Sequence, residues 1–149
     1  MIRPLTGDDR AGWEELWRGY LDFYRAEIPT AVTDRTFERL CSGTEGMFGF
    51  VADSGWGLTG LAHALVHPST WSASGYCYLE DLFVAPQTRG TTTARDLIEA
   101  VVTEATAQGL EKVYWHTNEF NGPARSLYDR VARFTSFVVY ERPLPPHTP

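Results

Sequence analysis

The feature that most constrains the fold is an apolar strand pattern that passes through a short turn into an amphipathic helix and then into a second strand. Residues 76–84 alternate as expected of a strand, and Pro86 ends the pattern. The helix that follows stops at Gly109, and its apolar face consists of Ala94, Leu97, Ile98, Val101, Val102 and Ala105. Residues 112–117 then predict another strand. A strand, helix and strand in this order form a right-handed crossover with two parallel strands.

The other elements follow from changes of period along the chain. We predict a strand at residues 1–5, a helix from about Asp8, a second helix at about 33–41 after Pro29, and strands at 47–53 and 58–67 joined as a hairpin. A short helix at about 122–131 and a last strand at 134–140 follow. The order β-α-α-β-β-β-α-β-α-β predicts the α/β class, with one mixed central sheet flanked by helices. We expect a single domain over residues 1–142 and a mobile Pro-rich tail over 143–149.

The first helix carries an aromatic stripe that has two readings. The apolar residues Trp13, Leu16, Trp17, Tyr20, Leu21 and Tyr24 recur at helical spacing. Such stripes usually face the protein interior, but this one is also suited to lining a substrate groove. Both readings stay open at this point.

Composition narrows the class of protein. A chain of 149 residues that is 43 % hydrophobic suits one globular domain. Its formal charge of −6 disfavours nucleic acid and anionic membranes as partners and fits a cationic substrate better. Cys41 and Cys77 are too few for a disulfide framework, and no apolar run is long enough to span a bilayer. We therefore expect a cytoplasmic protein without a membrane anchor.

The turn before the long helix has the chemistry of a phosphate site. Arg89, Gly90 and the threonines Thr91, Thr92 and Thr93 lead into the helix, so backbone N–H groups and the positive end of the helix dipole face outward there. That geometry suits a pyrophosphate. The alternative is a capped loop with no ligand, because short glycine motifs also recur by chance.

Two adjacent acids, Glu80 and Asp81, interrupt the apolar strand that precedes this turn. Strict alternation places Glu80 with Tyr78 and Leu82 on one face, and Asp81 with Leu79 and Phe83 on the other. Partial burial raises the pKa of a carboxylate toward the range useful for a general base, and Glu80 is our candidate for that role. The alternative is a structural pair between one of the acids and an arginine such as Arg125.

Taken together, these motifs resemble the GCN5-related N-acetyltransferase (GNAT) superfamily. The run Tyr78-Leu-Glu-Asp, the turn with Arg89, Gly90 and Ala94, and the downstream set Asn121, Ala124, Leu127 and Tyr128 carry the resemblance, which extends loosely over residues 2–140. The match is nearest to the diamine and polyamine branch. It implies an enzyme that transfers acetyl from acetyl-CoA to a primary amine by direct attack in a ternary complex. The acceptor would be a small amine, a polyamine or a lysine-like amine.

The resemblance also implies roles for individual residues. Glu80 would accept the amine proton and Tyr128 would protonate the leaving thiolate. The coenzyme would be held by Leu82, Phe83, Val84, Arg89, Gly90, Thr91, Thr92, Thr93, Ala94, Arg95, Asn121 and Ala124. The acceptor would lie near Tyr24, Asp81, Trp115 and His116. Members of the family often form homodimers, so a homodimer is an open expectation, although no interface is located.

One departure from the family pattern motivates a rival reading. Thr92 stands where the family has a glycine, and its β-branched side chain narrows the backbone conformations open to the turn. The rival is a degenerate acyl-CoA-binding or regulatory module with weak or no activity. An RNA-directed enzyme is disfavoured by the lack of a basic patch. We expect no metal, because His63 and His67 would stand about 13 Å apart along a strand.

Overall fold

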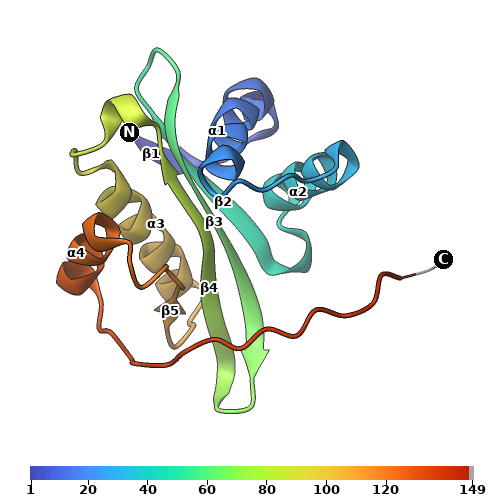
Figure 1. Cartoon of the computed structure of the whole chain (residues 1–149), viewed down its shortest axis with the longest axis vertical. Helices are drawn as coiled ribbons and strands as arrows, with labels where there is room; N and C mark the ends of the chain where they lie inside the picture. Colours follow the sequence, from blue (N-terminus) through green and yellow to red (C-terminus); the bar gives the residue numbers. More distant parts are fainter. Residues whose placement is uncertain (148–149) are drawn as a thin grey trace. The chain divides into compact units, whose positions relative to one another are not determined.

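The computed structural model describes residues 1–147, and its contacts group the chain into two compact units, Met1–His116 and Thr117–Pro149. The first unit contains a five-stranded sheet and three α-helices (Figure 1). Its strands are β1 (Ile2–Pro4), β2 (Met47–Asp53), β3 (Leu58–Ser69), β4 (Ser72–Val84) and β5 (Val113–Tyr114). Its helices are α1 (Arg10–Phe23), α2 (Thr30–Ser42) and α3 (Thr93–Ala107), with short 3-10 turns η1 (Gly7–Asp9), η2 (Thr44–Gly46) and η3 (Pro86–Thr88). The α/β class predicted from the sequence is confirmed.

The sheet has the simple order β1-β2-β3-β4-β5. Neighbouring strands from β1 to β4 run antiparallel, whereas β5 pairs with β4 in parallel, as the predicted crossover through α3 requires. Helices α1 and α2 cover one face of the sheet and α3 covers the other (Figure 1). The sheet is therefore mixed and protected on both sides.

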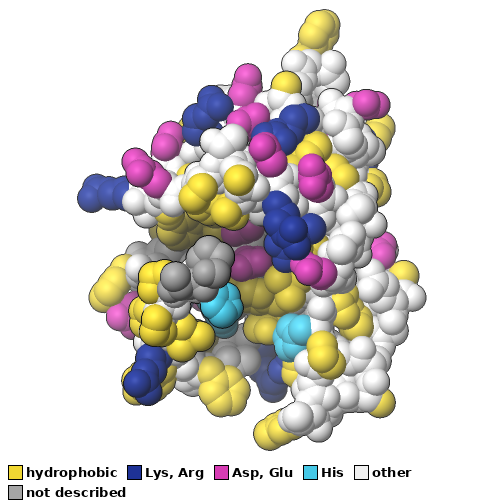
Figure 2. Space-filling view, turned by 90° about the vertical axis from the view of Figure 1, so that its right-hand side faces the viewer, with side chains coloured by type: hydrophobic (Ala, Val, Ile, Leu, Met, Phe, Trp, Pro, Cys, Tyr) yellow, Lys and Arg dark blue, Asp and Glu magenta, His cyan; other side chains and the backbone are white. Residues whose placement is uncertain are grey.

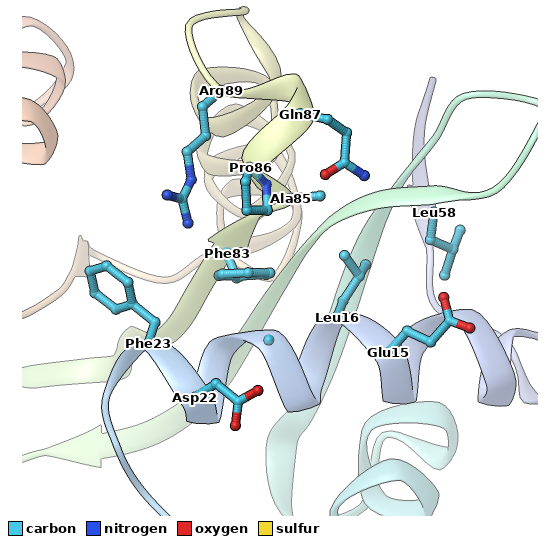
Figure 3. A pocket seen from close by; sticks show the side chains of 11 residues that line it. Glu15, Leu16, Asp22, Phe23, Leu58, Phe83, Ala85, Pro86, Gln87 and Arg89 are labelled. Atoms are coloured by element: carbon cyan, nitrogen blue, oxygen red, sulfur yellow. The ribbon is translucent and has the colours of Figure 1, made fainter.

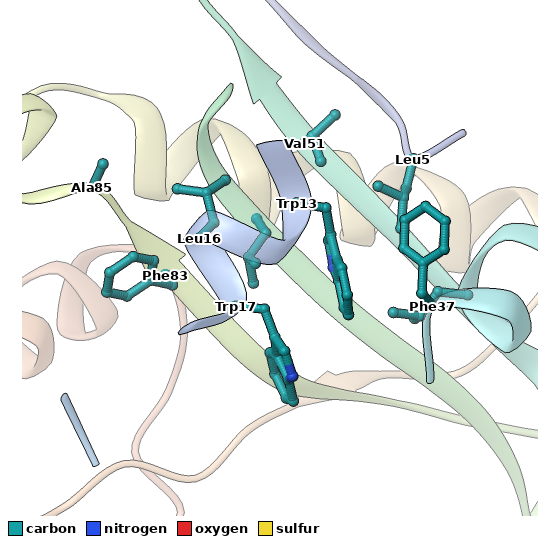
Figure 4. Packing of buried hydrophobic residues seen from close by; sticks show 10 residues of the cluster. Leu5, Trp13, Leu16, Trp17, Phe37, Val51, Phe83 and Ala85 are labelled. Atoms are coloured by element: carbon teal, nitrogen blue, oxygen red, sulfur yellow. The ribbon is translucent and has the colours of Figure 1, made fainter. Parts of the chain in front are cut away.

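Aromatic side chains of α1 and α2 form the core on the first face. Trp13 is fully buried, with its ring centroid 4.9 Å from that of Phe37 and 5.8 Å from that of Trp17. Figure 4 shows these rings against the sheet, with Val51 from β2 and Phe83 from β4 nearby. The interior reading of the aromatic stripe thus holds for its first half.

The start of the first helical segment is held by an ion pair as well as a cap. The Asp9 carboxylate accepts hydrogen bonds from the Thr6 backbone N–H at 2.8 Å and from two Arg3 nitrogens at 2.7 and 2.8 Å. Arg3 also donates to Asp53 at the end of β2. The acidic start predicted near Asp8 therefore ties the helix to β1 and β2.

The second unit contains α4 (Gly122–Val131), at the bounds that the sequence predicted. The predicted strand at residues 134–140 is wrong: the described chain forms no regular element there, and Phe137 and Tyr140 are 87 % and 94 % exposed. A strand is stable only when the edge of another strand accepts its backbone hydrogen bonds, which local sequence preference does not supply. Residues 143–147 of the predicted tail are irregular and exposed, and 148–149 lie outside the described residues.

Candidate active site

A β-bulge brings the two adjacent acids of β4 to one cavity. His63 of β3 pairs with Asp81, but the next residue, Ala64, pairs with Leu79, so Glu80 is the extra residue of β4. Glu80 and Asp81 consequently line the same cavity, and the prediction that they point to opposite faces is wrong. The alternation of side chains between the two faces of β4 fails here because the bulge adds one residue to β4 and none to β3.

Asp81 is oriented by a buried chain of hydrogen bonds. The Trp13 indole Nε1 donates to His63 Nε2 at 2.8 Å, and His63 Nδ1 lies 2.9 Å from Asp81 Oδ2. Since indole N–H is only a donor, His63 Nε2 must accept, and the ring proton must lie on Nδ1, where it is donated to Asp81. His63 is 3 % exposed, so this contact fixes the Asp81 carboxylate from inside the core.

The cavity that the acids share has a volume of about 600 Å³ and lies between α1, α2 and the sheet. From α1 and the segment just after it come Trp17, Tyr20, Leu21 and Tyr24, and from α2 come Thr36 and Arg39. The second half of the aromatic stripe thus lines a groove while the first half is core. The two readings left open by the sequence apply to successive turns of one helix.

Electrostatics distinguish the groups in this cavity. Partial burial, and then the neighbouring Asp81 carboxylate, raise the pKa of Glu80, while the Arg39 guanidinium acts in the opposite direction. Burial and the charge of Asp81 also raise the pKa of the Tyr20 phenol, which therefore stays protonated. A carboxylate with a raised pKa beside a second, fixed carboxylate is suited to accept a proton from a bound cation.

The predicted phosphate turn has the expected backbone. Gly90 has φ of +82°, and a side chain there would meet no atom within 4 Å, so the turn is open at this point. Helix α3 then begins at Thr93, leaving the N–H groups of its first turn without partners within the helix. The open turn and the 15-residue helix behind it fit a pyrophosphate.

The side chains of the turn are used differently from the expectation. The Thr92 hydroxyl donates to Asp96 Oδ2 at 2.8 Å, and the Thr91 hydroxyl donates to the Thr88 carbonyl at 2.7 Å. Arg89 turns toward α1: its Nε donates to the Val84 carbonyl, and its guanidinium lies over the rings of Phe23 and Phe83. The backbone groups are therefore the parts of this turn left for an anion, and the role of Arg95 stays a prediction.

A second cavity of about 470 Å³ lies beside this turn (Figure 3). It is lined by Glu15, Leu16, Gly19, Asp22 and Phe23 from α1, by Leu58, and by Phe83, Ala85, Pro86, Gln87 and Arg89 from the end of β4 and η3. Tyr20 and Phe83, whose rings meet edge to face at 6.3 Å, stand between the two cavities. The predicted coenzyme residues Phe83 and Arg89 thus face a cavity adjacent to the one that holds the acids.

The edge of β4 opens next to these cavities. Strand β5 pairs only at Cys77 and Tyr78, so within the described chain the stretch Leu82, Phe83 and Val84 is paired with β3 alone. Apart from the Val84 carbonyl, which accepts from Arg89, its backbone groups on the β5 side have no strand partner within the described chain and could pair with a ligand that adds as a strand. The resemblance assigns Leu82, Phe83 and Val84 to the coenzyme, and that role stays a prediction.

The remaining predicted residues lie elsewhere. Asn121, the N-cap of α4, belongs to the second unit together with Ala124 and Tyr128, and their roles stay predictions. His116 contacts Tyr78 through its Nδ1 at 3.2 Å and, like Trp115, is not among the described residues that line the acidic cavity. Arg125 donates to the Glu119 carbonyl, whereas Asp81 accepts its hydrogen bond from His63.

Sequence reasoning missed two contributors to the acidic cavity. Tyr20 was noted only as one of the aromatic stripe, and Arg39 was not singled out. Arg39 lies on α2 between Phe37 and Leu40, which are both buried. Helical spacing therefore predicts that Arg39 lies at the boundary of the core, but it does not predict that Arg39 lies beside Glu80. Only the packing of α2 against the sheet brings these groups together.

Residues 1–147 contain no group of three or more potential metal ligands, and none of their helices is long and apolar enough to cross a membrane. Among the described residues on the face shown in Figure 2, acidic and basic side chains are interspersed.

Comparison with known proteins identifies the family. Residues 13–133 match the acetyltransferase (GNAT) family. The chain is 33 % identical over 144 residues to the D-amino-acid N-acetyltransferase HPA3 of Saccharomyces cerevisiae, covering 95 % of this chain and 89 % of that protein. It is 32 % identical over 98 residues to the thialysine N-epsilon-acetyltransferase of Caenorhabditis elegans, covering 64 % of this chain and 61 % of that protein.

Solved structures agree at the level of fold. The aminoglycoside N-acetyltransferase AAC(6')-Iy, in complex with a bisubstrate analogue, superposes with a TM-score of 0.84 at 20 % identity over 97 % of both chains. The family match spans most of the chain, from α1 to the end of α4. The chain therefore belongs to the GNAT family of acetyltransferases.

Proposed function

We propose that this enzyme transfers the acetyl group of acetyl-CoA to the primary amine of a small molecule. The observation that carries the proposal is the convergence of Glu80 and Asp81 at the β4 bulge, inside a cavity that adjoins the predicted coenzyme site. Relatives named for D-amino acids and thialysine support an amine acceptor of modest size. The cavity of about 600 Å³ is in the range of small-molecule sites.

The proposed reaction is a direct attack within a ternary complex. The amine enters as a cation, attracted by the two carboxylates, and loses a proton to Glu80 directly or through water. The amine lone pair then forms a bond to the acetyl carbon, the bond from that carbon to sulfur breaks, and the nitrogen gives up a second proton, which restores the Tyr128 phenol after it has protonated the thiolate. Backbone N–H groups near Val84 would stabilise the developing oxyanion, and Tyr128 would supply the proton to the thiolate.

The coenzyme would bind along β4 and at the turn before α3. Backbone groups of Leu82 to Val84 would hold the pantetheine arm, as an added strand is held. The pyrophosphate would lie at the turn of Gly90 to Ala94 with Arg95 beside it, and Asn121 and Ala124 would contact the arm from the second unit. No metal is needed for this chemistry.

The test measures binding and turnover separately. Calorimetry with acetyl-CoA should give micromolar binding that Tyr128→Phe retains, while the same variant lowers kcat for an acetylated amine by about 10²-fold or more. Binding without turnover of any amine tested would contradict the proposed activity. A loss of binding in Tyr128→Phe would instead place that residue in coenzyme recognition.

One observation favours the weaker alternative of a degenerate coenzyme module. Thr92 replaces the glycine that the family has at this position. Its hydroxyl donates its hydrogen bond to Asp96, so it does not donate to a phosphate in place of the close backbone approach that a glycine allows. Under this alternative, Thr92→Gly should raise acetyl-CoA affinity or turnover substantially. An unchanged Kd in Thr92→Gly would count against it, and Thr106→Gly near the other end of α3 controls for the general effect of a glycine in the helix.

A further inference from the structure

Arg39 brings a positive charge into the cavity that holds the acids. It lies on α2, and its side chain lines the cavity together with Glu80 and Asp81. Its guanidinium is close enough to act electrostatically on the Glu80 carboxylate. The cavity therefore presents opposite charges from two different elements, β4 and α2.

One N–H group of the Arg39 guanidinium, at Nε, has no hydrogen-bond acceptor among the described residues. Arg39 Nη2 pairs with Glu45 Oε2 at 2.6 Å, and this pair holds the side chain against the turn after α2. Arg39 Nε is buried, and within residues 1–147 no acceptor lies within hydrogen-bonding distance of it. A buried donor without an acceptor costs free energy, and a charged donor costs more than a neutral one, so the protein leaves the hydrogen bonding of this guanidinium incomplete. Nε itself is closed to ligands, and a carboxylate would meet the cation through the accessible part of the side chain, which is 32 % exposed.

We infer that Arg39 binds the carboxylate of the acceptor, so that the substrate is a zwitterionic amino acid with its amine at Glu80 and Asp81. The inference rests on the proposed function and narrows its substrate class. An amine without a carboxylate offers the Arg39 guanidinium no anionic partner. A diamine or polyamine places a second cation in a cavity that already contains the guanidinium, which costs Coulomb energy.

The rest of the cavity suits the side chain of such an amino acid. Its wall includes Trp17, Leu21, Ile28, Met47 and Leu65, which are apolar. Two charged ends and an apolar wall recognise the ammonium, the carboxylate and the side chain of one molecule at three points.

The test compares three acceptors that differ only in the carboxyl position: leucine in both enantiomers, leucinamide, and 3-methylbutylamine. We expect kcat/KM for one leucine enantiomer to exceed that of the amide and the amine by at least about tenfold, the value of a charged hydrogen bond. Arg39→Gln should lower kcat/KM for leucine about 10- to 100-fold, mainly through KM, and its effect on 3-methylbutylamine should be smaller by at least about tenfold. Arg35→Gln, at an exposed position of the same helix, is the matched control.

The outcomes separate this inference from the proposed function. A uniform loss with all three acceptors in Arg39→Gln would assign Arg39 a purely structural role and overturn the inference while acetyl transfer stands. Equal turnover of leucine and leucinamide would overturn it as well. Calorimetry of leucine with the CoA-bound enzyme decides the case without turnover: binding that Arg39→Gln abolishes supports the inference even if acetyl transfer fails, and no binding to the unmodified enzyme overturns it.

Discussion

Glu80 is exposed, but it differs from an isolated surface glutamate because the bulge places it beside Asp81 at a cavity that both acids line. Burial and the adjacent charge raise its pKa, and the aspartate is itself fixed by His63 and Trp13. The adjacency of two acids was visible in the sequence, and the assignment of Glu80 as a candidate base came from it. Their common direction was not, because it depends on which residue of β4 is left unpaired by β3.

The raised pKa of Glu80 predicts the pH dependence of acetylation. The base must be deprotonated, so kcat/KM should fall as the pH drops through a pKa above the ordinary glutamate value. Glu80→Gln should lower kcat about 10²- to 10⁴-fold and remove this acidic limb, with acetyl-CoA affinity retained. Glu99→Gln, exposed on α3, is the control. An unaltered acidic limb in Glu80→Gln would assign the titration to another group.

Asp9 provides a test of stability at the same scale. Its hydrogen bonds from Arg3, and further bonds from Thr6, lower the pKa of its carboxyl from 3.8 to about 2. A lowered folded-state pKa stabilises the protein above the unfolded value of 3.8, and this stabilisation is lost as the pH falls through about 2. Asp9→Asn should therefore lower the free energy of unfolding by about 1 kcal/mol at pH 7.

The measurement is urea unfolding at pH 7 and at steps down to pH 3. The deficit of Asp9→Asn should narrow over the acidic steps, whereas Asp8→Asn, at an exposed position, should differ little from the unmodified protein throughout. A deficit that stays constant with pH would show that the lost contribution is packing and not the charge.

At the scale of elements, the spacing of apolar residues predicted most of the helices and strands, because that spacing indicates which face of an element is buried. Strand β2 has its predicted bounds, and α3 covers the predicted apolar face, with Leu97, Ile98 and Val101 buried. Strand β5 is shorter than predicted, since it pairs with β4 at only two residues. The strand predicted at residues 134–140 failed because an alternating pattern does not provide a pairing partner.

Helix α3 packs closely against β3, which predicts the effect of filling a glycine. A Cβ on Gly60 would lie 3.1 Å from Leu97 Cδ1 and from the Phe83 carbonyl oxygen, and 3.3 Å from Thr93 Cγ2. Gly60→Ala should lower the free energy of unfolding by about 1 to 3 kcal/mol, because the start of α3 must move. Denaturant unfolding checks this, with Gly7→Ala as control, since a Cβ on Gly7 meets no atom within 4 Å. Equal stability of the two variants would refute the close packing.

At the scale of the whole molecule, length and charge set the class, and the family match agrees with it. A chain of 149 residues with a formal charge of −6 was expected to be one domain that acts on a cationic group. The match to the GNAT family spans residues 13–133. The single domain over residues 1–142 stays a prediction, as does the homodimer.

Removal of residues 143–149 tests the predicted boundary. Residues 143–147 are exposed, and Leu144 is 82 % exposed, so the truncated chain should lose less than about 0.5 kcal/mol of stability and keep its acetyl-CoA affinity. Calorimetric melting and acetyl-CoA titration of the truncated chain check both. A marked drop in the melting temperature would place the tail within the folded domain.

The sequence by itself determined the strand, turn and helix that build the predicted coenzyme site, since these depend on local alternation, helical spacing and the glycine of the turn. It also placed Glu80 and Asp81 side by side. The tertiary structure decided where those acids point, which half of the aromatic stripe is core, and that Arg39 of α2 faces them. The physical reason is that bulges, strand partners and cavities arise from contacts between residues distant in the chain, and no local pattern encodes the register of such contacts.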